Sequence, residues 1–114
     1  MSAVTGQLPF ACAYDDGSGS LESLNAKRVT QCALSRICGS CGRSLGRPIA
    51  FVGTELEAGR NAFHFPPLHA ACAQALVEQV PGWQVVTTAA FEFVRPGRED
   101  LDRRPTFQPN SILD

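Results

Sequence analysis

Apolar residues recur at about helical spacing in the first half of the chain. The stripe lies within residues 21–36 and consists of Leu21, Leu24, Val29 and Cys32. The opposite face would carry the bases Lys27, Arg28 and Arg36. This periodicity predicts a helix over residues 21–36, which Ser20 or Ser23 could cap. A strand over residues 28–34 is the alternative interpretation.

Two short apolar runs further along the chain indicate β structure. Residues 48–52 read Pro-Ile-Ala-Phe-Val, and residues 61–65 alternate as Asn-Ala-Phe-His-Phe. The polar residues 53–60 between them contain Gly59 and predict a connecting loop. Together these segments predict a β-hairpin.

A second helix is expected after Pro66 and Pro67, over residues 68–80. It is rich in alanine, and Pro81-Gly82 would end it. Residues 83–94 then alternate and contain many β-branched and aromatic residues, which predicts one or two strands. The aromatic residues of the predicted strands recur at strand intervals, so we expect most of them to form the core.

The two ends of the chain contain little periodic pattern. Residues 1–20 predict a flexible N-terminal arm, whose short apolar patch at 8–14 could dock on the core or on a partner. Residues 95–114 are charged and contain three prolines, which predicts an extended C-terminal tail with Phe107, Ile112 and Leu113 as possible anchors. Residues 21–94 would then form a single domain.

Candidate chemistry is concentrated between residues 37 and 80. Cys38 and Cys41 are separated by two residues, as are His69 and Cys72, and the second pair would share one face of the predicted helix. Three thiolates and one imidazole complete the tetrahedral shell typical of structural zinc. The odd number of cysteines, five, also favours metal over disulfides. We therefore expect one structural Zn²⁺ per chain.

Several residues have competing interpretations. Cys38 and Cys41 could instead form a redox pair, although the residues after Cys41 do not suit one. His64 is the alternative ligand should His69 not bind metal. Cys32 is expected to be a small core residue, and Cys12 to be structural or free.

The order of a cysteine turn, a hairpin and a helix that carries the last two ligands resembles a treble-clef zinc finger. The ligand pattern of Cys38, Cys41, His69 and Cys72 is also similar to half of a LIM domain, with a longer spacing of 27 residues between Cys41 and His69. The resemblance implies an α+β fold: a zinc core over residues 37–80, a preceding helix and a following β segment.

Charge and hydropathy limit the possible partners and compartments. The net charge of −1 is not that of a strongly basic nucleic-acid binder, but residues 27–75 carry six bases against two acids. Within this part, the candidate contacts to a partner are Lys27, Arg28, Arg36, Arg43 and Arg47. No membrane-spanning run and no secretory signal pattern are present, so we expect a cytoplasmic protein.

These patterns leave three hypotheses for function. The first is a non-enzymatic, zinc-stabilised interaction module that binds a protein partner through the zinc domain and its flanking arms. The second is a nucleic-acid-binding finger that contacts RNA, a ribosome or the transcription machinery. The third is an enzyme similar to the HNH nucleases, which the treble-clef resemblance suggests and for which His64 would be the catalytic residue.

Overall fold

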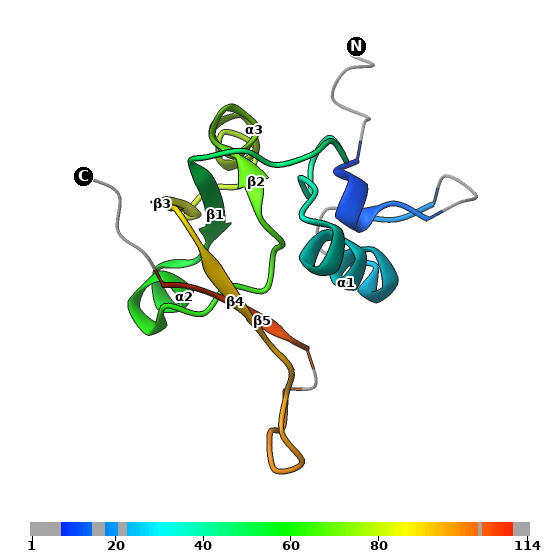
Figure 1. The fold of residues 1–114 in the computed structure, drawn as a ribbon, viewed down its shortest axis with the longest axis vertical. Coiled ribbons are helices and arrows are strands. Elements are labelled where there is room, and N and C mark those ends of the chain that lie inside the picture. The colour runs from blue at the N-terminus through cyan, green and yellow to red at the C-terminus, as the bar shows by residue number, and fades with distance from the viewer. Residues whose placement is uncertain (1–7, 15–17, 21–22, 103, 111–114) are drawn as a thin grey trace.

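The computed structural model describes residues 8–14, 18–20, 23–102 and 104–110. These form a small mixed helix–sheet protein with antiparallel strands (Figure 1). The elements, in chain order, are the 3₁₀ helix η2 (Phe10–Cys12), α1 (Ala26–Ser35), β1 (Ile49–Gly53), α2 (Glu55–Arg60), β2 (Leu68–His69), α3 (Ala70–Val77), β3 (Gln84–Thr88), β4 (Phe91–Val94) and β5 (Thr106–Pro109). None of the described helices has the length and apolar character needed to cross a membrane.

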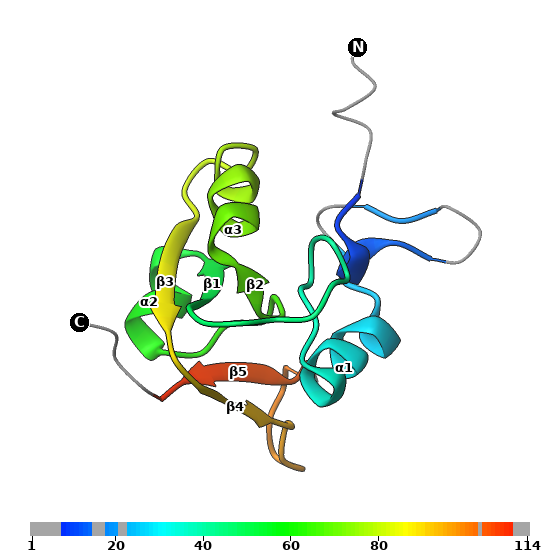
Figure 2. The ribbon, with the colours of Figure 1, turned by 45° about the horizontal axis from the view of Figure 1, so that its top comes forward.

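Strand β1 is the centre of the fold. It pairs antiparallel with β2 on one side and with β3 on the other, and all five of its residues are buried. Because alternate side chains of a strand point to opposite faces, β1 contributes to two cores. Ala50 and Val52 pack with residues of α3, whereas Ile49 and Phe51 pack with aromatic residues of the other face. Figure 2 shows α3 on one side of this sheet and the β4–β5 ribbon on the other.

Helix α1 is shorter than the predicted helix and begins at a different cap. Asn25 caps it, because the Asn25 side chain accepts a hydrogen bond from the backbone N–H of Lys27. The prediction of a Ser20 or Ser23 cap was wrong, and residues 21 and 22 lie outside the described part of the chain. Val29 and Cys32 are buried, as the apolar stripe predicted.

The predicted loop over residues 53–60 was wrong, because it contains helix α2. Thr54 and Glu57 form a capping box, in which each side chain bonds the backbone N–H of the other residue. This arrangement satisfies backbone donors that the first turn of a helix leaves without partners, so a short helix is stable here.

The predicted pairing of residues 48–52 with residues 61–65 was also wrong. The partners of β1 are β2 and β3, and Phe63 instead exchanges two backbone hydrogen bonds with Phe107, of 2.9 and 2.7 Å. The Phe63 ring is fully buried beside Phe51. Residues 61–65 therefore do not pair with β1 as expected, because Phe63 is buried against β5 instead.

The predicted second helix is divided between two elements. Leu68 and His69 form β2, and α3 occupies only Ala70–Val77. One or two strands were expected within residues 83–94, and the structure contains two, β3 and β4, which belong to different sheets.

The C-terminal part is not an extended tail throughout. Strand β5 pairs with β4 in an antiparallel ribbon, and Asn61 donates a side-chain hydrogen bond to the carbonyl of Pro109. Phe107 is fully buried. Its ring contacts other rings that were expected to be core: Phe51, Phe91 and Phe93. The predicted anchors Ile112 and Leu113 lie outside the described residues.

Candidate metal centre

The structure brings together the four side chains that the sequence singled out as metal ligands. Cys38 and Cys41 lie in the turn after α1, His69 ends β2 and Cys72 lies in the first turn of α3. One ligand atom from each residue lies within 4.8 Å of all the others. This is the one cluster among the described residues that could hold a metal ion.

The separations between donor atoms suit a tetrahedral ion. The Nδ1 of His69 lies 3.4 Å from the Sγ of Cys41 and 3.9 Å from the Sγ of Cys72. Ligand atoms around a tetrahedral zinc are about 3.5–3.8 Å apart, given bonds of about 2.3 Å to sulfur and 2.0 Å to nitrogen. The donor set therefore fits such an ion without large rearrangement.

His69 is held in the tautomer that a metal ligand needs. Its Nε2 lies 2.8 Å from the carbonyl oxygen of Ser44, so this nitrogen carries the proton and donates it. The lone pair is then on Nδ1, which faces the thiols. An outer hydrogen bond of this kind is usual for metal-binding histidines.

The sulfur of Cys38 accepts two hydrogen bonds from the protein backbone. Backbone N–H groups of Ser40 and His69 point to it, at 3.3 and 3.5 Å. Cys38 itself is fully buried. A buried anionic sulfur needs such donors and a nearby cation to offset the loss of hydration.

Two glycines shape the cysteine turn. Gly42 has a φ of +76°, in the left-handed region that glycine adopts without a steric penalty. A Cβ on Gly39 would lie 2.7 Å from the Cγ of Pro66, so only glycine fits beside that ring. The turn can therefore pack closely against the chain that leads into β2.

The thiols of the cluster influence one another strongly. Burial raises the pKa of Cys72 to about 12, and the neighbouring thiols of Cys38 and Cys41 add to this effect. Burial also opposes ionisation of Cys41, but hydrogen bonds from the Arg43 backbone and from the other cluster side chains lower its pKa below the ordinary value. Three adjacent thiolates thus repel one another unless a cation lies between them.

The described part of the N-terminal arm packs on the cysteine turn. The backbone N–H groups of Phe10 and Ala11 donate to the carbonyls of Ser40 and Gly39, at 3.0 and 2.9 Å. Ala11 and Cys12 are fully buried. The prediction of a flexible arm was therefore wrong for residues 10–12, while residues 1–7 and 15–17 lie outside the described part of the chain. Of the two expected docking places for the apolar patch, the structure shows the core.

The remaining two cysteines are core residues outside the cluster. Cys12 and Cys32 are both fully buried. Burial raises the pKa of Cys12 to about 11 and that of Cys32 to about 12, where the nearby Cys38 adds to the shift. Both thiols therefore stay protonated at neutral pH, as the expectation of a core or structural role implied.

His64 is not part of the cluster and does not lie in a strand. Its Nδ1 lies 3.2 Å from the carbonyl oxygen of Pro105, and its Nε2 lies 3.4 Å from the carboxylate of Asp102. Its backbone N–H donates to Glu57. His64 therefore connects the segment before β2 to the segment before β5.

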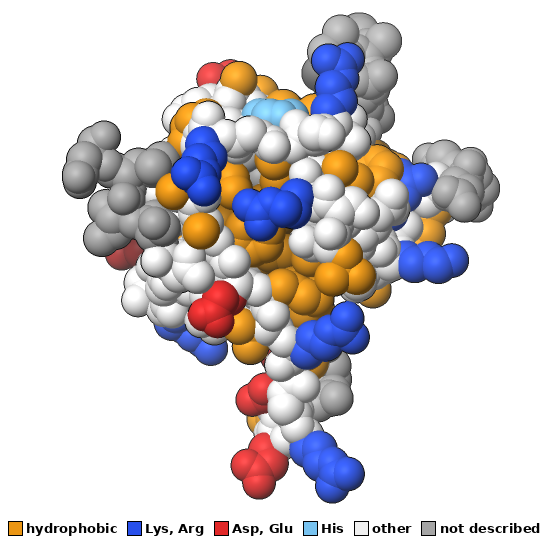
Figure 3. Space-filling model, in the orientation of Figure 1, with side chains coloured by type: hydrophobic (Ala, Val, Ile, Leu, Met, Phe, Trp, Pro, Cys, Tyr) orange, Lys and Arg blue, Asp and Glu red, His pale blue; other side chains and the backbone are white. Residues whose placement is uncertain are grey.

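The five predicted contact bases belong to α1 and to the chain that follows it. Lys27 and Arg28 lie on α1, Arg36 follows α1 directly, and Arg43 and Arg47 follow the cysteine turn. The stretch from Ser23 to Thr54 contains no acidic residue. At the right of Figure 3, over α1, the coloured side chains include Lys and Arg but neither Asp nor Glu. The described charged side chains of this face are therefore basic, in a protein whose net charge is −1.

Sequence reasoning missed two contributors to this region. Ser44 acts through its main-chain carbonyl, which any residue type supplies, so no sequence signal could have identified it. Phe10 packs between the cysteine turn and Arg28, and its only signal was the short apolar patch at 8–14.

Comparison of the chain with protein-family models, with curated proteins and with solved structures finds no match.

Proposed function

We propose that the protein is a non-enzymatic interaction module whose fold is stabilised by one zinc ion, bound by Cys38, Cys41, His69 and Cys72. The observation that supports this proposal best is the composition of the cluster, with three sulfurs and one nitrogen within 4.8 Å of one another. Sulfur-rich donor sets favour Zn²⁺ over Mg²⁺ or Ca²⁺, which prefer oxygen. Four protein ligands also complete the shell, so no position is left for a catalytic water.

The order of the elements supports a treble-clef assignment for the zinc core. The cysteine turn comes first, β1 and β2 pair as antiparallel strands, and α3 begins directly after β2 with the last ligand in its first turn. The segment between β1 and β2 contains α2 and extends the usual hairpin. The two ligand pairs are thus supplied by a turn and by a helix start, as in a treble clef.

The contacts of His64 favour a non-enzymatic role. Both of its ring nitrogens face protein acceptors, and it lies outside the cluster that could hold a metal. A nuclease of the HNH kind would need a free histidine nitrogen beside a further metal site. The HNH hypothesis is therefore the least supported of the three.

For the partner, a protein remains our first proposal. Its support has changed, because residues 10–12 and 106–109 pack on the protein's own core instead of being free to order on a partner. What remains is exposed apolar surface away from α1, such as Leu56 on α2 and Leu101. A nucleic acid is the second candidate, and the absence of acidic residues between Ser23 and Thr54 favours it.

Native mass spectrometry of the purified chain, before and after chelation, tests the metal part of this proposal. We expect one zinc per chain, and we expect Cys72→Ser to lose it. Cys12→Ala is the matched control, because Cys12 is a buried cysteine outside the cluster and should retain the metal. A metal-free wild-type chain would contradict the proposal, and the cysteine turn would then be reinterpreted as a redox pair. Absorbance at 260 nm of the same sample reports bound nucleic acid.

A further inference from the structure

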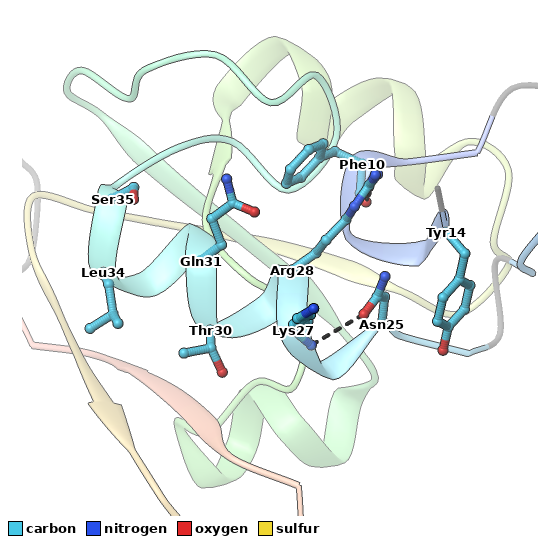
Figure 4. Close-up of a pocket in the computed structure, with 9 residues that line it drawn as sticks. All are labelled: Phe10, Tyr14, Asn25, Lys27, Arg28, Thr30, Gln31, Leu34 and Ser35. Atoms are coloured by element: carbon cyan, nitrogen blue, oxygen red, sulfur yellow. Dashed lines mark hydrogen bonds between the residues drawn. The ribbon is translucent and has the colours of Figure 1, made fainter. Parts of the chain in front are cut away.

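A groove of about 800 Å³ lies along α1, between this helix and the N-terminal segment that contains Phe10 and Tyr14 (Figure 4). The rings of Phe10 and Tyr14 contribute to its wall from the N-terminal segment. Lys27, Arg28, Thr30 and Gln31 contribute from α1. The groove is therefore open and mixed in character, with aromatic, cationic and hydrogen-bonding groups on one surface.

The charges of the groove favour an anionic partner. The described lining residues include two cations, Lys27 and Arg28, and no carboxylate. The acidic residues nearest in sequence, Asp15, Asp16 and Glu22, lie outside the described part of the chain. Helix α1 itself contains no acidic residue. The described residues of this surface therefore complement a partner of negative charge.

Arg28 is held in place before any partner binds. Its Nη1 donates to the carbonyl oxygen of Phe10 at 3.2 Å, and its guanidinium carbon lies 4.5 Å from the centre of the Phe10 ring. Phe10 is fixed in turn by its backbone hydrogen bond to Ser40 in the cysteine turn. A guanidinium that is already ordered loses less conformational entropy when it contacts a phosphate or a planar base.

Aromatic and amide groups distinguish a nucleic acid from other anionic chains. Tyr14 is 44% exposed, so its ring can stack on a base, and stacking is typically worth about 1–3 kcal/mol per base. Gln31 and Thr30 can form hydrogen bonds with base edges. An acidic peptide could form ion pairs with Lys27 and Arg28, but its carboxylates would not stack on the Tyr14 ring.

We propose that this groove binds single-stranded nucleic acid, with Tyr14 stacking on a base and with Lys27 and Arg28 contacting phosphates. The inference rests on the second candidate partner proposed above, a nucleic acid, and names the surface that would bind it. Ten helical residues span about 15 Å, which is enough for two or three nucleotides. A duplex is a poorer match, because its bases are already stacked inside the helix.

Fluorescence anisotropy with the full, zinc-loaded chain tests the proposal. The probe is a labelled 12-nucleotide oligouridine, and an oligothymidine, a DNA duplex and a polyglutamate peptide of similar charge serve for comparison. We expect the two single strands to bind in the micromolar range at 50 mM salt. Contacts to two phosphates predict a slope of log K against log salt of about −1.4. Tighter binding of the peptide or the duplex than of both single strands would overturn the proposal.

Two substitutions in the groove, and one control outside it, test where the oligonucleotide binds. Lys27→Glu should weaken binding of the oligonucleotide by about tenfold, while Arg98→Glu, with the same charge change on the β4–β5 connection, should leave it within about twofold. Tyr14→Leu should also weaken binding, because it removes the ring and keeps an apolar side chain. Equal effects of Lys27→Glu and Arg98→Glu would overturn the proposal. Zinc content of every sample, measured by native mass spectrometry, separates this outcome from failure of the metal site.

Discussion

The imidazole Nε2 of His69 lies 2.8 Å from the main-chain carbonyl oxygen of Ser44, and this contact determines which ring nitrogen faces the thiols. Ser44 belongs to the same loop as Cys38 and Cys41, and Ile37 and Ser44 are bridged across that loop. The cysteine turn therefore supplies two ligands and also orients a third. A metal bound here would connect two segments that are already in contact.

Replacement of His69 should separate its role as a ligand from its role in packing. We expect His69→Ala to weaken zinc binding by more than about 100-fold, because loss of even an outer-shell partner typically costs 10–100-fold. His69→Cys restores a fourth donor and should keep one ion per chain. Competition with a chromophoric zinc chelator measures both affinities. Wild-type affinity in His69→Ala would show that His69 is not a ligand.

Removal of the metal should unfold much of the chain. Structural zinc in small fingers typically contributes about 10–16 kcal/mol to folding, whereas a whole domain is stable by only about 5–15 kcal/mol. Chelation, or the variant Cys72→Ser, should therefore remove most of the far-ultraviolet circular dichroism signal of the helices. An unchanged spectrum in Cys72→Ser would contradict a structural role for the site.

Asn25 should contribute to stability through both atoms of its side-chain amide. Its Oδ1 accepts the hydrogen bond from Lys27, and its Nδ2 donates to the carbonyl of Ala13 at 2.9 Å. Asn25→Ala should cost about 2–3 kcal/mol in the free energy of unfolding, because it removes the cap and leaves a carbonyl without its donor. Asn25→Asp keeps the cap but places a carboxylate oxygen against the Ala13 carbonyl oxygen, so it should also destabilise the chain.

Urea denaturation of the zinc-loaded chain measures these costs. Ser23→Ala is the control, since Ser23 was one of the two predicted caps and is exposed. Its free energy of unfolding should stay within about 0.5 kcal/mol of wild type. A larger loss in Ser23→Ala than in Asn25→Ala would show that the helix begins earlier than Ala26.

The burial of Phe107 predicts that β5 is part of the folded core. Phe107→Ala should cost about 3–5 kcal/mol in the free energy of unfolding, because it leaves a cavity among the surrounding rings. Leu101→Ala, at a side chain that is 99% exposed, should change the stability by less than about 0.5 kcal/mol. Chemical denaturation of both variants gives the comparison, and equal stabilities would place Phe107 outside the core.

Alkaline pH should destabilise the protein through Cys12 and Cys32. Their pKa values in the folded chain are raised to about 11 and about 12, from an ordinary value of 9.0. An acid with a raised folded pKa ionises more easily after unfolding, so stability is present below pH 9 and falls above it. Each thiol should remove about 1 kcal/mol between pH 8 and pH 10.

A double variant isolates this contribution from other groups that titrate in the same range. Cys12→Ala together with Cys32→Ala should lose about 2 kcal/mol less than wild type over this interval, as measured by urea denaturation at both pH values. An identical pH dependence of the two proteins would mean that these thiols are accessible or already ionised in the folded state.

The four residues of the cluster could be identified from the sequence because their spacing is local. Two residues between Cys38 and Cys41, and two between His69 and Cys72, are visible without any knowledge of the fold. The central strand and the strands at 83–94 were also predicted, since apolar and β-branched runs depend on neighbouring residues. These features could be predicted without knowing which distant residues contact one another in the fold.

The errors have two different causes. Helix α2 was predictable in principle, because Thr54 followed by Glu57 is the pattern of a capping box, but the polar composition and Gly59 suggested a loop. Strand β5 was not predictable in the same way. Pro105 precedes it and Pro109 is its last residue, and the bridge between Phe63 and Phe107 joins segments that are far apart in the sequence.

Phe107 is added to the growing chain during synthesis later than the four residues of the candidate metal cluster. The last residue of the candidate metal cluster, Cys72, leaves the ribosome 35 residues before Phe107. At about 5–20 residues per second, this is a delay of roughly 2–7 s. Throughout this interval a nascent chain has all four residues of the cluster but lacks the side chain that covers Phe51. Metal can therefore be acquired first, while an aromatic surface is exposed to chaperones until the last strand is made.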